Sequence, residues 1–407
     1  MFKPHSSLKK GDRFRLGNNS GVDDQLDAVT SVSGRSRCSK VNTLLNSIKV
    51  TSLKFGMIES SALEDISSSN TNEIKHGVTL TWENLTVVSD KKATFKISNL
   101  LRKKEKNCSS KNTIINNVSG IAQSNEILAI MGASGAGKTS LLNALNFRNN
   151  QSLNVYGEIK VNGQLIRSQN ELSSISGYVQ QNDLFIESLT VKETLIFQAM
   201  LRMDKSISKE KRFKRIEEVI HDLNLKKCQN FAVDIQGKKG VSGGEKRRLA
   251  FACEILTDPL ILFCDEPTSG LDSFIALSVI ECMKSLAKQG RTIICTIHQP
   301  SSEIFELFDR LCLVSDGKLA FNGPINKCNQ FFESQGYQVP VNYNPAEFYV
   351  KTLAFVPSDK ENSLEKLKKI CDGYEKSDYY QNLTREIKEV CDNKSFQDRI
   401  NMNTKNE

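Results

Sequence analysis

A glycine-rich segment that ends in a lysine and a threonine carries the strongest chemical signal in the sequence. Residues 132–139 read GASGAGKT and stand between the apolar run EILAIM and the helical pattern SLLNALNF. In the pattern G-x-x-x-x-G-K-[ST], the glycines let backbone N–H groups converge on phosphates at a helix N-terminus. The lysine supplies a positive charge and the threonine hydroxyl ligates Mg²⁺. A simple glycine turn is the alternative, but it would require neither the lysine nor the threonine.

The sequence therefore predicts a phosphate-binding loop. The residues expected to contact the nucleotide there are Gly132, Ala133, Ser134, Gly135, Ala136, Gly137, Lys138, Thr139 and Ser140.

Two carboxylates follow a short apolar run, LILFCDE, at residues 260–266. The run is typical of a buried strand whose carboxyl end opens on a nucleotide crevice. We expect Asp265 to hold Mg²⁺ through water, together with Thr139, and Glu266 to orient and polarise the water that attacks the γ-phosphate. Many strands end in an acid, so this pattern indicates nucleotide chemistry only in combination with the phosphate-binding loop.

A third segment, VSGGE at residues 241–245, precedes the helical pattern KRRLAFACEIL. It places Ser242, Gly243, Gly244 and Glu245 at the start of a helix, which is a second anion-binding N-terminus in the same chain. One bound nucleotide does not need two such helix ends.

In this combination, the three segments resemble the ATP-binding cassette (ABC) ATPases. In that family two cassettes pair head to tail, and the signature segment of one closes over ATP held by the other. The resemblance implies that Gln181, in GYVQQND, is the Q-loop residue that senses Mg²⁺ and relays to a transport domain. It also implies that Asp272 belongs to the D-loop and that His298, in TIHQP, is the switch histidine. A lone histidine after a strand is more often a hydrogen-bonded core residue.

Four longer segments resemble the G subfamily of ABC half-transporters, and within it the eye-pigment transporters of insects. They are VQQNDLFIESLTVKETLIFQAMLRM, CDEPTSGLDSF, TIHQPSSEIFELFD and NYNPAEFYV, and the similarity runs from about residue 78 to residue 373. The resemblance implies ATP and Mg²⁺ as cofactors and a second half-transporter as partner, preferably a different one. It also implies transport of a small organic substrate, with pigment precursors as candidates, by a membrane domain that follows the cassette.

One residue of the usual cassette is missing. Many ABC cassettes stack an aromatic side chain on adenine in the region of LTWENLTVV, but the matching position here is Val87 or a close neighbour. We therefore expect weak discrimination between bases. The nearby Trp82 is expected to lie in the core rather than to hold the adenine.

The elements that position these residues alternate between strand and helix. The buried-strand patterns LILFCDE and RTIICTIH indicate a largely parallel sheet, and two hairpins are predicted at Asn162-Gly163 and Asp316-Gly317. Residues 190–240 are expected to be mostly helical, beginning with a capping box of Thr190 and Glu193. The predicted fold class is α/β. The resemblance specifies it as an ABC-type P-loop NTPase cassette with an antiparallel β subdomain, a RecA-like parallel-sheet core and a helical signature subdomain.

The chain divides into three predicted regions. Residues 1–77 form a disordered arm rich in Ser and Asn, in which residues 44–53 are either a sticky linker or a docking element. Residues 78–340 form the cassette. Residues 341–407 form a connecting segment that begins as an extended stretch and leads through an amphipathic helix to an absent membrane domain. The apolar stripe of this helix is expected to pack against a neighbour, with a membrane surface as the alternative. The stripe consists of Leu364, Leu367, Ile370, Cys371 and Tyr374.

Composition limits the alternatives. The 407 residues carry a net charge of +8, which predicts at most weak attraction to anionic surfaces. The 11 cysteines include no C-x-x-C pair, so we expect neither a disulfide framework nor a zinc site, but a reducing, cytosolic environment. The chain as given has no apolar run long enough to span a bilayer and is expected to be soluble, although the full-length protein would be integral to a membrane at its cytoplasmic face.

Two other functions remain open. One is a soluble ABC ATPase that acts on ribosomes or DNA, although a single cassette without a long heptad insertion argues against it. The other is a truncated, non-transporting product that binds ATP and competes for a partner half-transporter.

Overall fold

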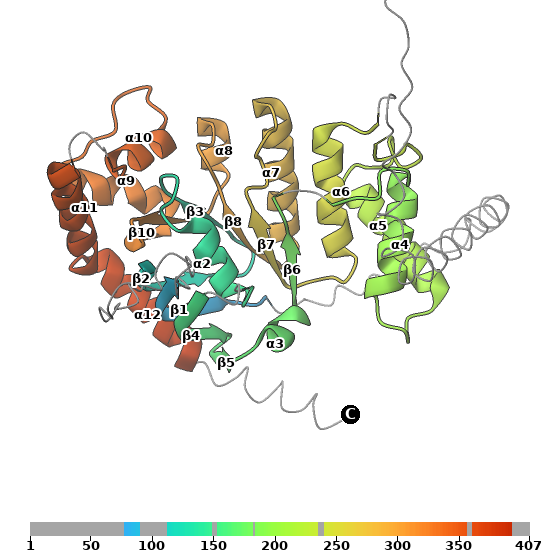
Figure 1. The fold of residues 1–407 in the computed structure, drawn as a ribbon, viewed down its shortest axis with the longest axis horizontal. Helices are drawn as coiled ribbons and strands as arrows, with labels where there is room; N and C mark the ends of the chain where they lie inside the picture. The colour runs from blue at the N-terminus through green and yellow to red at the C-terminus, as the bar shows by residue number, and fades with distance from the viewer. Residues whose placement is uncertain are drawn as a thin grey trace, which may run out of the picture. The chain divides into compact units, whose positions relative to one another are not determined.

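The computed structural model describes residues 77–89, 112–148, 153–181, 184–234, 240–355 and 360–392. Nearly all of the predicted arm, including residues 44–53, lies outside these ranges. The described residues form two sheets and the helices around them (Figure 1). The predicted α/β fold class is confirmed.

The first sheet is antiparallel, with strand order β2-β1-β4-β5. Its strands are β1 (Leu80–Ser89), β2 (Asn112–Ala122), β4 (Leu153–Val161) and β5 (Gln164–Ile166). The hairpin predicted at Asn162-Gly163 joins β4 to β5, with φ of +48° and +81° at its two central residues. Trp82 on β1 is fully buried, as predicted, and so are its neighbours Leu80 and Thr81.

The second sheet has the order β10-β9-β3-β8-β7-β6 and is parallel except for β10. Its strands are β3 (Ile127–Met131), β6 (Ser176–Val179), β7 (Ile261–Asp265), β8 (Thr292–Thr296), β9 (Arg310–Ser315) and β10 (Lys318–Pro324). Every residue of β3, β7 and β8 is buried, as expected for parallel strands covered on both faces. The carboxyl ends of these three strands therefore meet at one edge of the sheet.

Helices cover both faces of the parallel sheet, and α6 stands between α7 and the pair α4 and α5 (Figure 1). The bounds are α2 (Lys138–Leu145), α3 (Gln169–Ser173), α4 (Val191–Arg202), α5 (Lys209–Asp222), α6 (Gly243–Ile255), α7 (Ser273–Lys288), α8 (Ser302–Glu306), α9 (Ile325–Ser334), α10 (Pro345–Thr352), α11 (Lys360–Glu375) and α12 (Asp378–Asp392). The predicted capping box of Thr190 and Glu193 begins α4. None of the helices in the described ranges is both long and apolar enough to cross a bilayer.

The expectation of an extended stretch after residue 336 is wrong, because the stretch contains α10. The Asn344 side chain caps this helix by accepting a hydrogen bond from the Ala346 N–H at 2.9 Å. Pro345 occupies the first helical position, where its missing N–H removes no helical hydrogen bond. A proline can break a helix or begin one, and Pro345 begins α10.

The predicted stripe on α11 packs against the same chain. Of its five residues only Leu364 is exposed, at 46%, and the other four are buried. Tyr374 contacts the rings of Phe321 on β10 and Phe331 on α9, and its hydroxyl donates to the Asn322 carbonyl at 2.6 Å. The stripe therefore covers β10 and α9 rather than a membrane surface.

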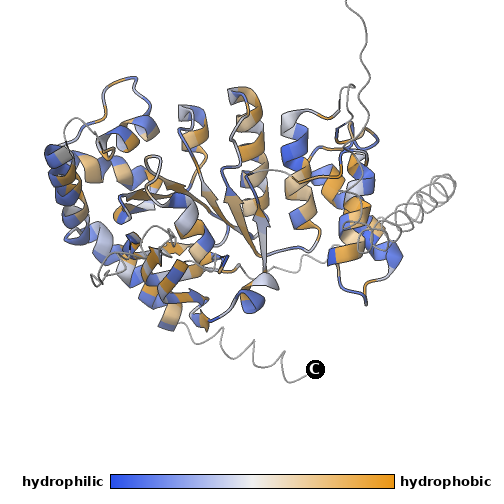
Figure 2. Ribbon diagram, in the orientation of Figure 1, coloured by the Kyte–Doolittle hydropathy of each residue, from blue (hydrophilic) through white to orange (hydrophobic). Residues whose placement is uncertain are grey.

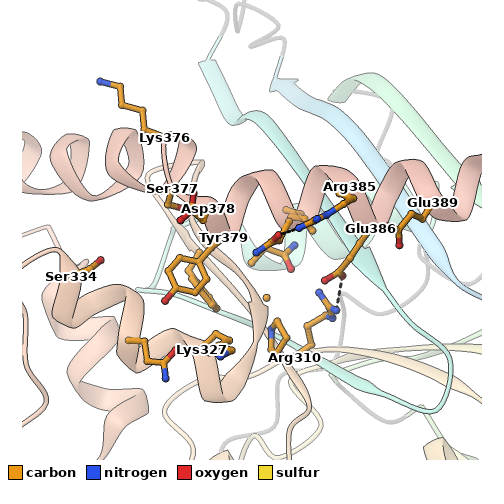
Figure 3. Close-up of a pocket in the computed structure, with 17 residues that line it drawn as sticks. Arg310, Lys327, Ser334, Lys376, Ser377, Asp378, Tyr379, Arg385, Glu386 and Glu389 are labelled. Carbon is orange, nitrogen blue, oxygen red and sulfur yellow. Dashed lines mark hydrogen bonds and ion pairs between the residues drawn. The ribbon is translucent and has the colours of Figure 1, made fainter.

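Helix α12, which the sequence patterns did not predict, crosses from the parallel sheet to the antiparallel sheet. Its Leu383 and Ile387 pack on Ile121 of β2. Its Glu386 carboxylate accepts hydrogen bonds from Arg310 of β9 at 2.7 Å and from Gln123 at 3.3 Å. Figure 3 shows this ion pair at one side of a cavity of about 750 Å³ bounded by α9, β10 and α12.

Hydrophobic residues concentrate in the central strands and in the helices that flank them, such as α7 (Figure 2). By contrast, α11 and α12 show both hydrophobic and hydrophilic residues along their length. This two-sided character follows from their position, because each helix buries one face on the cassette and presents the other to solvent.

We predict that Leu383→Ala lowers the free energy of unfolding by about 2–4 kcal/mol, because it leaves a cavity between α12 and β2. Urea denaturation followed by circular dichroism measures the loss. Lys388→Ala is the control, since Lys388 is exposed on the same helix and its truncation should change stability by less than about 0.5 kcal/mol. Equal stability of the two variants would mean that α12 is not docked on β2.

Candidate nucleotide site

The predicted phosphate-binding loop connects the end of β3 to the start of α2. Its glycines all have positive φ, which is +155° at Gly132, +79° at Gly135 and +101° at Gly137, the N-cap residue of α2. A β-carbon at Gly132 would collide with the Val314 carbonyl oxygen, so this position requires glycine. The turn leaves Ser134 and Gly135 exposed at the tip of the loop, where a phosphate group has access to the backbone N–H groups.

Lys138 is buried at the base of the loop, with 7% of its surface exposed. Its ammonium group donates to the carbonyl oxygens of Gly132 at 3.0 Å and Ala133 at 3.1 Å. Burial lowers the pKa of Lys138, and the negative charges of Glu266 and Asp265 partly oppose that shift. The cation is therefore held between its own loop and the two acids, where phosphate oxygens would replace the carbonyl partners.

The Asp265 carboxylate, at the end of β7, is 7% exposed and receives two hydroxyl donors. Its Oδ1 accepts from Thr139 Oγ1 at 3.1 Å and from Thr296 Oγ1 at 2.7 Å. A threonine hydroxyl and a carboxylate beside a phosphate loop suit Mg²⁺, which retains several waters and takes few protein ligands. No cluster of three or more His, Cys, Asp or Glu side chains suited to a metal occurs in the described ranges.

Gln181, the third predicted metal ligand, lies nearer the other acid. Its Nε2 donates to Glu266 Oε2 at 2.8 Å. Because of this hydrogen bond, a movement of the Glu266 carboxylate would also move the Gln181 side chain. The structure therefore brings Gln181 to Glu266, whereas Thr139 and Asp265 contact each other directly.

Glu266 and His298 share a cavity of about 500 Å³ with Ser134 of the phosphate-binding loop and with the segment that precedes α7. Further residues that line it are Thr268, Ser269, Gly270, Leu271, Ser273, Ala276, Gln299, Pro300, Ser301 and Ile304. His298 is exposed rather than a core histidine. The loop tip, the acid and the histidine thus face one space at the edge of the sheet.

The predicted signature residues do not line this cavity. Ser242 caps α6: its Oγ accepts from the Glu245 N–H, and the Glu245 carboxylate accepts from the Ser242 N–H at 2.8 Å. Asp272 similarly caps α7, accepting from the Ile275 N–H at 2.9 Å. These residues have structural partners within the chain, and their predicted contacts with nucleotide remain a prediction.

Two further residues, which the sequence patterns missed, contact the acids at the carboxyl-end edge of the parallel sheet. Thr296 binds Asp265, as described above, and Arg247 of α6 donates to the backbone carbonyl oxygen of Glu266 and to those of Gln180 and Gln181. Neither residue belongs to a spacing pattern, and both contacts depend on tertiary structure. The fully buried Val87 is consistent with the missing aromatic, since its side chain offers no exposed surface to a base.

Two thiols lie directly beneath the acids. Cys264 of β7 and Cys295 of β8 are register partners, and both are fully buried. Burial raises the pKa of each thiol well above its usual value, and for Cys264 the neighbouring Cys295 adds to the shift. The small thiol at position 264 fits the buried strand.

Comparison with known proteins agrees with this geometry. Residues 115–269 match the ABC transporter family model, and residues 298–407 match the ABC-2 type transporter model. The chain is 51% identical to Protein white of Drosophila melanogaster over 264 residues, which are 64% of the chain and 38% of that protein. It is 44% identical to the ABC transporter ATP-binding protein/permease wht-3 of Caenorhabditis elegans over 327 residues, 80% of the chain and 50% of that protein. The chain belongs to the G subfamily of ABC transporters.

Its cassette is therefore an ABC transporter ATPase domain, and the resemblance seen in the sequence is confirmed. Protein scarlet of Drosophila melanogaster is a further relative, 44% identical over 262 residues, 64% of the chain and 39% of that protein. The chain spans half or less of the length of these three relatives.

We predict that Lys138→Ala weakens ATP binding at least about tenfold, or about 1.4 kcal/mol, because the phosphates lose their buried cation. Equilibrium binding of a fluorescent ATP analogue measures the change. Lys327→Ala, at the cavity shown in Figure 3, removes a lysine remote from the loop and should leave the affinity unchanged. An unchanged affinity in the Lys138 variant would remove Lys138 from the nucleotide site.

Proposed function

We propose that the chain is the ATP-hydrolysing module of a half-transporter that couples hydrolysis to movement of a small organic substrate across a membrane. The observation that carries this proposal is the convergence of the buried Lys138, the paired Thr139 and Asp265, and the Glu266–His298 cavity on one sheet edge. The family supports it, because residues 298–407 match the ABC-2 type transporter model. Pigment precursors are candidate substrates on the strength of the resemblance to insect eye-pigment transporters.

Each residue at the edge has a task in this proposal. The loop N–H groups and Lys138 bind the phosphates, and Thr139 and Asp265 hold Mg²⁺, which neutralises phosphate charge when bound. Glu266 orients and polarises the attacking water, and His298 contacts the γ-phosphate. Gln181 follows the state of Glu266 through their 2.8 Å hydrogen bond and relays it toward a transport domain.

A second cassette would complete each ATP site. The signature residues Ser242–Glu245 begin α6, whereas the phosphate-binding loop begins α2, and the two helix starts do not share the cavity around Glu266. In the head-to-tail arrangement, the signature of a second half-transporter closes over ATP bound by this chain. A different half-transporter is the preferred partner, on the resemblance to the eye-pigment transporters.

We predict that Glu266→Gln reduces ATP turnover by more than about 100-fold, because the group that polarises water is lost. Binding of the ATP analogue should stay within about twofold of the parent, since the phosphate cradle is intact. Phosphate release and equilibrium binding measure the two quantities. Hydrolysis at the parent rate would contradict the assignment of Glu266.

Pairing of cassettes can be tested with two inactive variants. Lys138→Ala removes the phosphate site and Ser242→Arg blocks the signature, so each homodimer is inactive. In a mixed dimer of this chain one composite site keeps both intact parts, so equal mixing restores about a quarter of parent activity if two copies of the chain pair. Absence of recovery, when the Ser242 variant still binds ATP, would favour a different half-transporter as the obligatory partner.

A further inference from the structure

The backbone of Glu266 adopts a conformation that side-chain-bearing residues seldom populate. Its φ is +44°, in the left-handed region, although it is not a glycine. Such a conformation costs on the order of 1 kcal/mol and persists only where the surroundings determine it. The groups that bind Glu266 together set where its carboxylate points. The Gln181 amide binds the carboxylate and the Ser269 N–H donates to the carbonyl at 3.1 Å, while two buried side chains bind the backbone.

On the N-terminal side, the Glu266 N–H donates to Thr296 Oγ1 at 2.9 Å. The same hydroxyl donates to Asp265 Oδ1 at 2.7 Å. Thr296 is fully buried, and its one hydroxyl proton is directed to the carboxylate while an oxygen lone pair accepts the amide. A single oxygen on β8 thus sets the positions of both acids at the end of β7.

On the C-terminal side, Arg247 of α6 binds three carbonyl oxygens. Its Nη1 donates to Gln180 O at 2.8 Å, and its Nη2 donates to Gln181 O at 2.7 Å and to Glu266 O at 3.4 Å. Arg247 is 4% exposed, so these bonds act away from bulk solvent. The planar guanidinium group can hold several acceptors in fixed directions, which a lysine ammonium on a flexible stem does less well.

We infer that Thr296 and Arg247 are positioning residues for ATP hydrolysis, which hold the backbone of Glu266 and of the Gln180–Gln181 segment so that the Glu266 carboxylate meets the attacking water. The inference rests on the proposed function, in which Glu266 polarises that water. Neither side chain touches the reacting atoms: Arg247 acts through the carbonyl groups of Glu266, Gln180 and Gln181, and Thr296 acts through the Glu266 N–H and the Asp265 carboxylate.

Arg247 also connects two parts of the proposed cycle. It lies on α6 about one and a half helical turns after Ser242, the residue that would meet ATP held by a partner cassette. A displacement of α6 when two cassettes close would move the guanidinium, and with it the Glu266 and Gln181 carbonyls. Closure of the signature is thereby linked directly to placement of the catalytic carboxylate.

The first test compares Thr296→Val, which keeps the shape and removes the hydroxyl, with Thr296→Ser, which keeps the hydroxyl. In the 407-residue chain, we expect kcat for ATP to fall about 10- to 100-fold in the valine variant, as a misplacement of about 1 Å produces. KM and binding of the ATP analogue should stay within about twofold, and the serine variant should retain at least about a third of parent kcat.

The second test compares Arg247→Lys with Arg212→Lys. Arg212 of α5 is a matched control, because it is also buried and donates to the backbone carbonyls of Ile207 at 3.1 Å and Asp204 at 2.7 Å. Both variants should lose similar stability in urea, whereas only Arg247→Lys should lower kcat, by about tenfold or more, with KM unchanged. Circular dichroism confirms that each variant is folded before its rate is compared.

This inference would be overturned if a folded Thr296→Val or Arg247→Lys variant had the kcat of the parent. If Glu266→Gln were inactive in the same assay, the proposed function would remain intact. Equal losses in Arg247→Lys and Arg212→Lys would also overturn the inference, because they would show a general effect of stability. Continued hydrolysis by Glu266→Gln would instead overturn the proposed function. If a variant in one pair does not fold, the other pair of variants tests the inference.

Discussion

The site depends on the burial of one charged group, the carboxylate of Asp265 at the end of β7, which is only 7% exposed. A buried charge without partners destabilises a protein by several kcal/mol, so Asp265 must be matched by donors from its neighbours. Thr139 provides one from the first turn of α2, and Thr296 provides another from the last residue of β8. Satisfying one carboxylate therefore fixes the phosphate-binding helix and two central strands relative to one another.

A second set of polar contacts joins the two sheets. Arg310 of β9 is 4% exposed and pairs with Glu126, just before β3, and with Glu386 of α12. Since α12 also packs its apolar face on Ile121 of β2, the helix contacts both sheets at once. The segment that follows the predicted cassette is thus part of the packing of the described fold.

The parts predicted from the sequence are those that local chemistry determines. The loop before α2, the two hairpins and the capping box of α4 each depend on residues close in the chain, and the structure has them where they were expected. Helix α10 was missed because Pro345 suits both a breaker and a first helical position, and only the Asn344 cap distinguishes them. The contacts of Thr296 and Arg247 could not be predicted, because they join residues that are distant in the chain. Thr296 binds Glu266, 30 positions away. Arg247 binds Gln181, 66 positions away, and Glu266, 19 positions away.

The two thiols beneath the acids have a consequence for reactivity. Oxidants and alkylating reagents attack the thiolate, and they need access to it. Cys264 and Cys295 are fully buried and their pKa values are raised, so at neutral pH both remain protonated and shielded. The thiols on β7 and β8 are therefore unreactive toward peroxide and maleimide while the cassette stays folded. Labelling of Cys264 or Cys295 would thus report opening of the parallel sheet.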